Sequence, residues 1–238
     1  MFKKSAVLGA VLFHSVCVFA AEGAAPNNSI FISGIQYSPQ SSYTYAGLVR
    51  AADGYQVGEG PYYKAIASYL TYRYNTTVNN AAVQISGNSP GVDVGAGYAW
   101  KGDGYTLDLS GAVGYRQLHV SPVVPANEKT GGVVSFSPQL QASVALTKDI
   151  EASTIANYTF GQQVAYARGR LLSRLPDSWF GGVETIYQKG KNYRINQTGL
   201  VIGKNLAGGY AVDLSAGRSR QRSGDTSNYV AVSLSRVF

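Results

Sequence analysis

Apolar and polar residues alternate along most of the chain. In the segment YTLDLSGAVGYR (105–116), Leu107 and Leu109 share one face, while Asp108 and Ser110 share the other. Successive side chains of a β-strand point to opposite faces, so this period of two predicts strands rather than helices. The same comparison along the chain predicts strands near 29–38, 42–51, 62–74, 80–101, 104–118, 131–147, 150–160, 163–174, 178–189, 193–204, 208–220 and 227–238.

The second face of these strands distinguishes a membrane barrel from a soluble sandwich. It carries Gly, Ala and Ser with scattered charges, and small residues suit the crowded interior of a modest barrel. A sheet in hydrocarbon must close, because its edges cannot be left unpaired. Aromatic residues gather near the strand ends, as interface girdles require: Tyr98, Trp100, Tyr105, Tyr115, Tyr158, Phe160, Trp179 and Tyr187. We predict an all-β, transmembrane, antiparallel up-and-down β-barrel of about twelve strands, with ten or fourteen as alternatives.

The connections between the strands predict their direction. Bacterial barrels have short periplasmic turns and longer outer loops. The short connections are 101–104, 147–149, 175–178 and 205–209. Residues 116–132 and 220–228 form longer connections that are expected to face the outside. With an even number of strands, both ends of the barrel then lie on the periplasmic side.

The first 20 residues have the features of a secretory signal peptide. Lys3 and Lys4 precede a mostly apolar stretch, and small residues allow cleavage after Ala20 or Ala21. The expected division is a signal peptide at 1–20, a short N-terminal segment at 21–28 and an outer-membrane β-barrel at 29–238. Such a protein is expected in the outer membrane of a Gram-negative cell, in contact with outer-membrane lipids.

Composition excludes several classes of chemistry. The chain has 20 basic and 13 acidic residues, and loss of Lys3 and Lys4 leaves 18 against 13, a formal +5. These charges are spread along the chain, so no nucleic-acid partner is expected. The single cysteine, Cys17, lies in the expected signal peptide, which leaves no disulfide or thiol chemistry. One remaining histidine and dispersed carboxylates predict no metal site and no cofactor.

The last strand ends in NYVAVSLSRVF (228–238), with a terminal aromatic residue. Alternation places one set of residues on the lipid face: Val230, Val232, Leu234 and Phe238. This pattern is similar to the signal that the barrel assembly machinery of the outer membrane reads. Arg236 also takes an outward position, where its long side chain is expected to reach the lipid headgroups.

A nucleophile and a base occur together in the longest outer connection. His119 precedes Ser121 by two residues, with Glu128 downstream, and this spacing resembles that of outer-membrane lipid A deacylases. Those enzymes carry the pair on a barrel strand, whereas the prolines that follow predict an irregular loop here. We therefore predict no catalytic residue, with a deacylase-like enzyme as the weakest alternative. The outer-loop residues of interest are His119, Ser121, Pro122, Pro125 and Asn127.

Charged residues on the predicted inward face are the remaining candidates for function. They are Asp93, Asp108, Arg116, Glu151, Arg168, Arg170, Glu184, Arg194 and Asp213. Two interpretations are open: a mutually paired plug that fills a narrow barrel, or a polar lining that holds or passes a hydrophilic ligand. Barrels of eight strands fill with side chains and those of sixteen leave a channel, so about twelve strands fit either.

From about Asp93 onward, the chain resembles the cellulose biosynthesis protein family BcsS. The resemblance rests on GYAW (97–100), GYRQLHVSPVVPAN (114–127), WFGGVE (179–184) and AGRSRQRSGDTSNYVAVSL (216–234). It implies a non-catalytic outer-membrane accessory to the biosynthesis and secretion of cellulose or a related exopolysaccharide, with that polysaccharide and its secretion complex as partners. The alternatives are a small porin-like channel and a structural outer-membrane protein. A polysaccharide-binding barrel would carry aromatic residues from its outer loops into its lumen.

Overall fold

The computed structural model describes residues 28–78, 81–123, 130–191, 193–222 and 224–238. Within these ranges the chain forms twelve strands and one short 3-10 turn, η1 (Ala207–Gly209). No helix of this part of the chain is long and apolar enough to cross a membrane. The strands are β1 (Ser29–Ser38), β2 (Ser41–Ala51), β3 (Gly60–Val78), β4 (Ala81–Gly102), β5 (Tyr105–Ser121), β6 (Gly131–Ala145), β7 (Ile150–Thr159), β8 (Val164–Arg174), β9 (Trp179–Lys189), β10 (Arg194–Leu206), β11 (Tyr210–Gln221) and β12 (Thr226–Val237).

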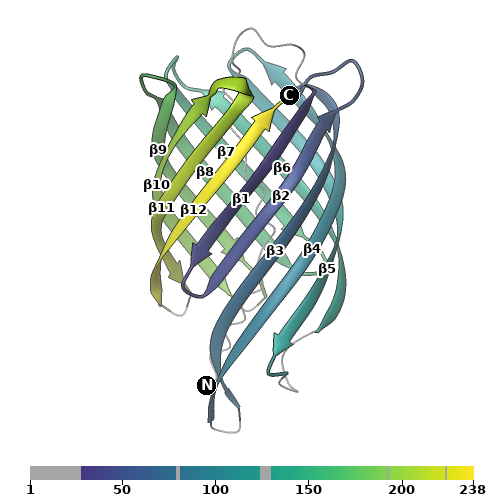
Figure 1. Ribbon diagram of the computed structural model, residues 1–238, viewed down its shortest axis with the longest axis vertical. Coiled ribbons are helices and arrows are strands. Elements are labelled where there is room, and N and C mark those ends of the chain that lie inside the picture. Colours follow the sequence, from purple (N-terminus) through teal and green to yellow (C-terminus); the bar gives the residue numbers. More distant parts are fainter. Residues whose placement is uncertain (1–27, 79–80, 124–129, 192, 223) are drawn as a thin grey trace.

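Each strand pairs antiparallel with its neighbours in sequence, and β1 pairs with β12 to close the barrel (Figure 1). The closing ladder runs from Ile30 opposite Val237 to Tyr37 opposite Val230. Beyond it, Ser29 and Phe238 exchange two backbone hydrogen bonds of 2.9 Å. Closure leaves no sheet edge, as a lipid environment demands. The predicted fold class and strand number are confirmed.

The two ends of the barrel differ. We call the end that carries Ser29 and Phe238 the terminal rim, and the opposite end the distal rim (Figure 1). The short turns that follow β4, β6, β8 and β10 lie at the terminal rim, together with η1. The connections that follow β5 and β11 lie at the distal rim, so the observed topology groups the turns as predicted.

The outward face is apolar and is bordered by two rows of exposed aromatic side chains. Near the terminal rim these are Tyr63, Tyr98, Trp100, Tyr105, Trp179, Tyr210 and Phe238. Towards the distal rim they are Tyr37, Tyr69, Tyr115, Phe136, Tyr158, Phe160 and Tyr187. Between the rows, exposed aliphatic side chains such as Val94, Leu109 and Leu200 cover the wall. This is the surface that a barrel presents to a bilayer, with aromatic rings at the headgroup level.

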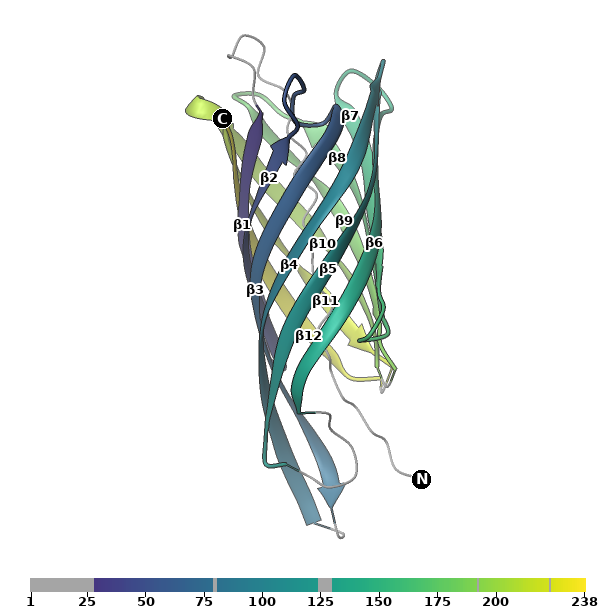
Figure 2. The same cartoon turned by 90° about the vertical axis from the view of Figure 1, so that its right-hand side faces the viewer.

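One side of the barrel is taller than the rest. β3 and β4 have 19 and 22 residues, against 10 and 11 in β1 and β2. Together with the end of β5 they project beyond the distal rim (Figure 2), and we call this part the extension. β3 and β5 are longer than the predicted 62–74 and 104–118. The reason is pairing: Ser86 and Asn88 of β4 lie opposite Ser121 and His119, so the ladder continues.

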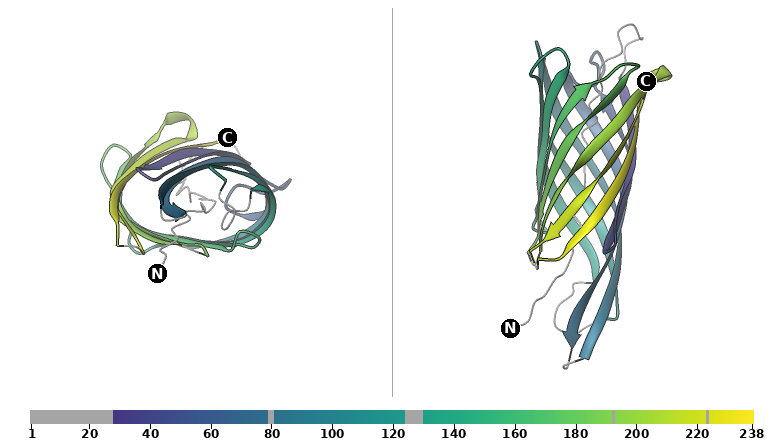
Figure 3. Two further views of the ribbon diagram at one scale, coloured as in Figure 1. Left: turned by 90° about the horizontal axis from the view of Figure 1, so that it is seen from below. Right: turned by 90° about the vertical axis from the view of Figure 1, so that its left-hand side faces the viewer.

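Opposite walls of the barrel meet in the interior. Figure 3 shows an oval cross-section. One continuous cluster of buried side chains joins Ile32, Tyr45 and Leu70 from β1–β3 to Ile155 and Tyr166 from β7 and β8. β2 and β8 are six places apart in the ring of twelve strands, which is the maximum. Apolar packing across the short axis therefore narrows the lumen at this level.

Candidate functional site

A buried ionic group lies on the inward face of β8–β12. Arg170 Nε donates to Glu184 Oε2 at 2.9 Å, and Arg170 Nη2 donates to Asp213 Oδ1 at 3.3 Å. The Tyr229 hydroxyl donates to Glu184 Oε1 at 2.9 Å, and Ser233 Oγ donates to Asp213 at 3.4 Å. One arginine thus holds carboxylates from two other strands. We call these five residues the ionic cluster.

A second polar group lies across the inward face of β3–β6. Lys64 Nζ donates to Ser110 Oγ at 2.8 Å, and Tyr62 donates to Asp108 Oδ1 at 2.8 Å. Arg116, which is buried, donates to the Ser89 carbonyl and to Ser68 Oγ, each at 2.8 Å. These bonds satisfy buried charges, which would otherwise be costly in a low-dielectric interior.

The inward face also carries many tyrosines. Tyr43 and Tyr45 of β2 stack at 5.9 Å between ring centroids, and Tyr72 and Tyr74 of β3 stack at 6.4 Å. The inward set is completed by Tyr62, Tyr166, Tyr193 and Tyr229. It runs from Tyr62 near the terminal rim to Tyr74 of the extension. Tyrosine rings can pack on the apolar faces of sugar rings while their hydroxyls make hydrogen bonds.

Glycines on the adjacent strands explain how these rings fit. Gly34 lies directly opposite Tyr45, and a methyl group added at Gly34 would meet the Tyr45 ring at 2.8 Å. Gly87 lies opposite Tyr72 in the same way, and its added methyl group would overlap that ring. The absence of a side chain at each glycine therefore leaves room for the tyrosine ring against the neighbouring strand.

The structure places most of the predicted inward charges on the inward face. Buried or half-buried inward positions hold Asp93, Asp108, Arg116, Arg168, Arg170, Glu184 and Asp213. Glu151 follows the same alternation and is half-buried beside the turn at the terminal rim. Arg194 does not belong to the set: it is exposed, while Ile195 beside it is buried. Its predicted inward position was wrong, because near a rim both faces of a strand meet water.

His119 and Ser121 lie on a strand rather than in an irregular loop. Both are exposed on the outward face of β5, which ends just before Pro122 because proline cannot continue the ladder as a donor. The expectation of a loop at this pair was therefore wrong. Pro125, Asn127 and Glu128 lie outside the described residues.

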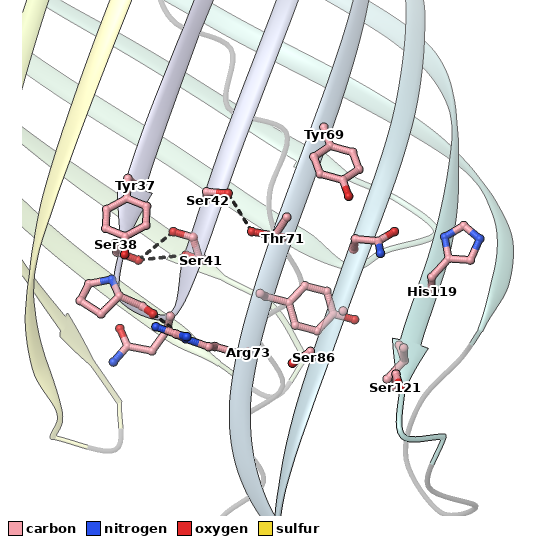
Figure 4. A pocket seen from close by; sticks show the side chains of 16 residues that line it. Tyr37, Ser38, Ser41, Ser42, Tyr69, Thr71, Arg73, Ser86, His119 and Ser121 are labelled. Atoms are coloured by element: carbon pink, nitrogen blue, oxygen red, sulfur yellow. Dashed lines mark hydrogen bonds between the residues drawn. The ribbon is translucent and has the colours of Figure 1, made fainter.

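Figure 4 shows His119 and Ser121 at one side of a hollow on the outer wall. The hollow has a volume of about 500 Å³ and lies between the β1–β2 turn and the extension. Its lining contains no carboxylate among the described residues. The described part of the chain also holds no group of three His, Cys, Asp or Glu side chains placed to bind a metal.

The residues of the expected assembly signal lie on one face of the last strand. Val230, Val232 and Leu234 are exposed on the outward face of β12, and Phe238 follows the same alternation. The Arg236 guanidinium lies over the Tyr210 ring, 4.8 Å from its centroid, and 5.7 Å from that of Phe238. These contacts place a cation within the aromatic row at the terminal rim.

The closed twelve-strand ladder, the apolar wall and its aromatic rows define a β-barrel of the outer-membrane type. The chain is similar to the KdgM porin, with 12% identity over 88% of this chain and 99% of that one, at a TM-score of 0.54. It also resembles the translocator domain of the autotransporter NalP from Neisseria meningitidis (14% identity, 89% of both chains, TM-score 0.54). A third neighbour is the COG4313 outer membrane channel from Pseudomonas putida F1 (10% identity, 94% and 100% covered, TM-score 0.52). At these low sequence identities, the similarity shows a shared fold and nothing about function.

The family follows from the sequence itself. The model of the cellulose biosynthesis protein BcsS matches residues 30–238, and the chain belongs to that family. The resemblance seen in the sequence is confirmed, and it extends to the strands before Asp93. The comparison with curated proteins gave no match. The protein is thus an outer-membrane-type barrel tied to cellulose synthesis.

Proposed function

We propose that this barrel is a non-catalytic outer-membrane accessory to the secretion of cellulose or a related exopolysaccharide, and that its inward tyrosines hold a segment of the glucan. The observation that carries the proposal is the set of tyrosine rings packed against glycines, such as Tyr45 on Gly34 and Tyr72 on Gly87. Because Tyr45 and Tyr72 are each only 3% exposed, a sugar ring would stack on them by displacing the apolar packing across the lumen. The family links the chain to cellulose.

The proposed location follows from the expected signal peptide and from the barrel surface. Residues 1–20 would direct export, and the terminal rim would face the periplasm, with the extension outside the cell. The C-terminal face with Val230, Val232, Leu234 and Phe238 would be read by the barrel assembly machinery. The two aromatic rows would lie at the two headgroup levels of the outer membrane, in contact with its lipids.

The interior contacts favour a constricted barrel over a wide porin. The ionic cluster joins β8, β9, β11 and β12, and Gln36 Nε2 of β1 donates to Gln197 Oε1 of β10 at 3.1 Å. Because these groups satisfy one another, they give the wall a fixed shape rather than a mobile charged lining. A glucan segment would then contact the inward tyrosines at the level of the ionic cluster and those nearer the distal rim.

Planar-bilayer conductance of the refolded barrel tests the proposal, with and without soluble cello-oligosaccharides. We expect a small conductance that the sugars lower, and we expect Tyr45→Leu to weaken this effect. Tyr63→Leu, which removes an exposed outward tyrosine, is the matched control and should leave the sugar effect unchanged. A large conductance that ignores the sugars would favour the porin-like alternative and contradict a glucan-binding lumen.

Two alternatives predict other outcomes. A purely structural barrel gives no conductance and no sugar binding by any residue of the lumen. A deacylase would require His119 and Ser121, which share the outward face of β5. Release of fatty acid from lipid A by the purified barrel, abolished by Ser121→Ala, would overturn the non-catalytic assignment.

A further inference from the structure

Most residues that line the hollow at the distal rim belong to the outward face of the wall, while Ser38, Tyr72, Gly87 and Val120 of the inward face also border it. Tyr37 and Tyr69, which belong to the distal aromatic row, line it towards the membrane (Figure 4). Arg73 lies beside the β1–β2 turn, and His119 and Ser121 line the opposite side, on β5. A ligand in this hollow would therefore sit at the outer edge of the aromatic row, where the headgroups of outer-leaflet lipids lie.

The lining of the hollow is rich in hydroxyl and amide groups. Ser42 and Thr71 share a hydrogen bond of 2.7 Å, and Ser86, Asn88 and Ser121 add further donors and acceptors. Groups of this kind match the alternating donors and acceptors along the edge of a sugar. The two tyrosine rings supply flat apolar surface beside them, which suits a ring with one apolar face.

The charged groups of the hollow are basic. Arg73 Nε donates to the Pro39 carbonyl at 2.9 Å, and the Arg73 amide donates to the Gln40 carbonyl at 2.8 Å, so this residue is held against the β1–β2 turn. His119 lies across the hollow from it. A guanidinium fixed in place binds phosphate through paired hydrogen bonds, and no carboxylate of the described lining would oppose a phosphate.

We infer that this hollow binds the phosphorylated sugar headgroup of a glycolipid of the outer leaflet. The sugar would pack on Tyr37 or Tyr69 and bond to the hydroxyl and amide groups and to His119, while its phosphate would meet Arg73 on the opposite side. A lipid of that leaflet reaches the outward residues of the hollow by lateral diffusion in the membrane. Tyr72 and Gly87, which belong to the proposed glucan contacts, also border the hollow, so the two proposed sites adjoin there.

Equilibrium titration of the folded full-length barrel in detergent tests the inference, with lipid A as the probe. We expect Arg73→Gln to weaken binding by about tenfold, because glutamine keeps an N–H donor but loses the charge-assisted, paired hydrogen bonds of the guanidinium. We expect His119→Gln to weaken binding less, because it alters the position of a donor to the sugar. Arg218→Gln is the matched control, because Arg218 is an exposed arginine on the outward face of β11. Its removal changes the net charge as much as Arg73→Gln does, and binding should be unchanged.

Two further binding measurements distinguish a glycolipid from a glucan as the ligand of the hollow. Dephosphorylated lipid A should bind more weakly than lipid A to the unaltered barrel, and it should lose its dependence on Arg73. Cellohexaose binding, if found, should not respond to either variant. An equal loss in Arg218→Gln would show charge attraction without a site and overturn the inference. So would cellohexaose binding that Arg73→Gln or His119→Gln abolishes, because the hollow would then be a glucan site. His119→Gln leaves the bond between Arg73 and the turn intact, so a folding defect in Arg73→Gln would not decide the result.

Discussion

Arg170 and Glu184 lie directly opposite each other on β8 and β9, with Nε and Oε2 2.9 Å apart and side chains only 3% and 2% exposed. Glu184 also accepts the hydroxyl of Tyr229, and Arg170 also reaches Asp213. A buried pair gains little net stability over an apolar pair, but the loss of one partner leaves an uncompensated charge. The cluster therefore makes the wall sensitive to single substitutions.

Glu184→Ala should destabilise the barrel by about 3–5 kcal/mol, because it leaves Arg170 short of a partner and removes the acceptor of Tyr229. Urea unfolding of the refolded barrel in lipid measures the change. Glu151→Ala is the matched control, since Glu151 is an inward carboxylate that is half-buried beside a turn. It should cost less than about 1 kcal/mol. Equal losses in the two variants would show that the ionic cluster has no special role.

Gly87→Ala should cost roughly 1–3 kcal/mol, because the added methyl group overlaps the Tyr72 ring and must displace it. The same substitution in a Tyr72→Ala background should cost little, and this difference is a coupling energy measured by a double-mutant cycle. Gly169→Ala serves as the control, since its added methyl group would meet its nearest atom at 3.6 Å. A cost for Gly87→Ala that persists without Tyr72 would contradict the packing of the ring on the glycine.

Deletion of Phe238 should lower the fraction of the protein that reaches the folded barrel in cells. The deletion removes the two backbone bonds to Ser29 and one of the rings beside Arg236. The folded fraction can be read from the mobility shift on heating before gel electrophoresis. Phe160→Ala, which removes an exposed aromatic residue of the distal row, should have a smaller effect. If the order of the two effects is reversed, the C-terminal residue is not part of an assembly signal.

The two tryptophans should report the same membrane depth. Trp100 and Trp179 are 43% and 41% exposed and both belong to the row at the terminal rim. In single-tryptophan proteins made by Trp100→Phe or Trp179→Phe, lipids brominated near the headgroup should quench fluorescence more than lipids brominated near the chain ends. Strong quenching from the chain ends by either residue would mean that the aromatic row does not mark the interface.

The sequence was sufficient to predict the strands and the outward face. Long segments of alternating residues determine both the strands and their outward face. Contact with lipid restricts the outward residues to apolar types, because a polar residue in place of Val94 or Leu109 would be unfavourable there. The inward face was less predictable, because small, charged and aromatic residues all occur there. Lys64 was missed although it alternates in phase with the inward Tyr62 and Ile66, and the inward tyrosines were overlooked because aromatic residues were assigned to the girdles.

The distal rim shows why the ends of strands were harder to predict. Prolines after Ser121 suggested a loop around His119, yet the partner strand β4 continues and supplies the pairing. Strand length beyond the bilayer is decided by the neighbour rather than by local composition, since water surrounds both faces there. Arg194 is a second example. It lies near a rim among polar residues, and there the sequence pattern does not show which side chains point inward.

The extension makes the barrel asymmetric, because one side of the distal rim is tall and the other side is low. From Thr71 to its last residue, β3 runs about 23 Å along the strand, at about 3.3 Å per residue, and Thr71, Arg73 and Asn75 are polar residues at its outward positions. The walls formed by β7–β12 have no counterpart (Figure 2). A neighbouring membrane protein can therefore lie close against the low side above the bilayer, while the tall side acts as a screen.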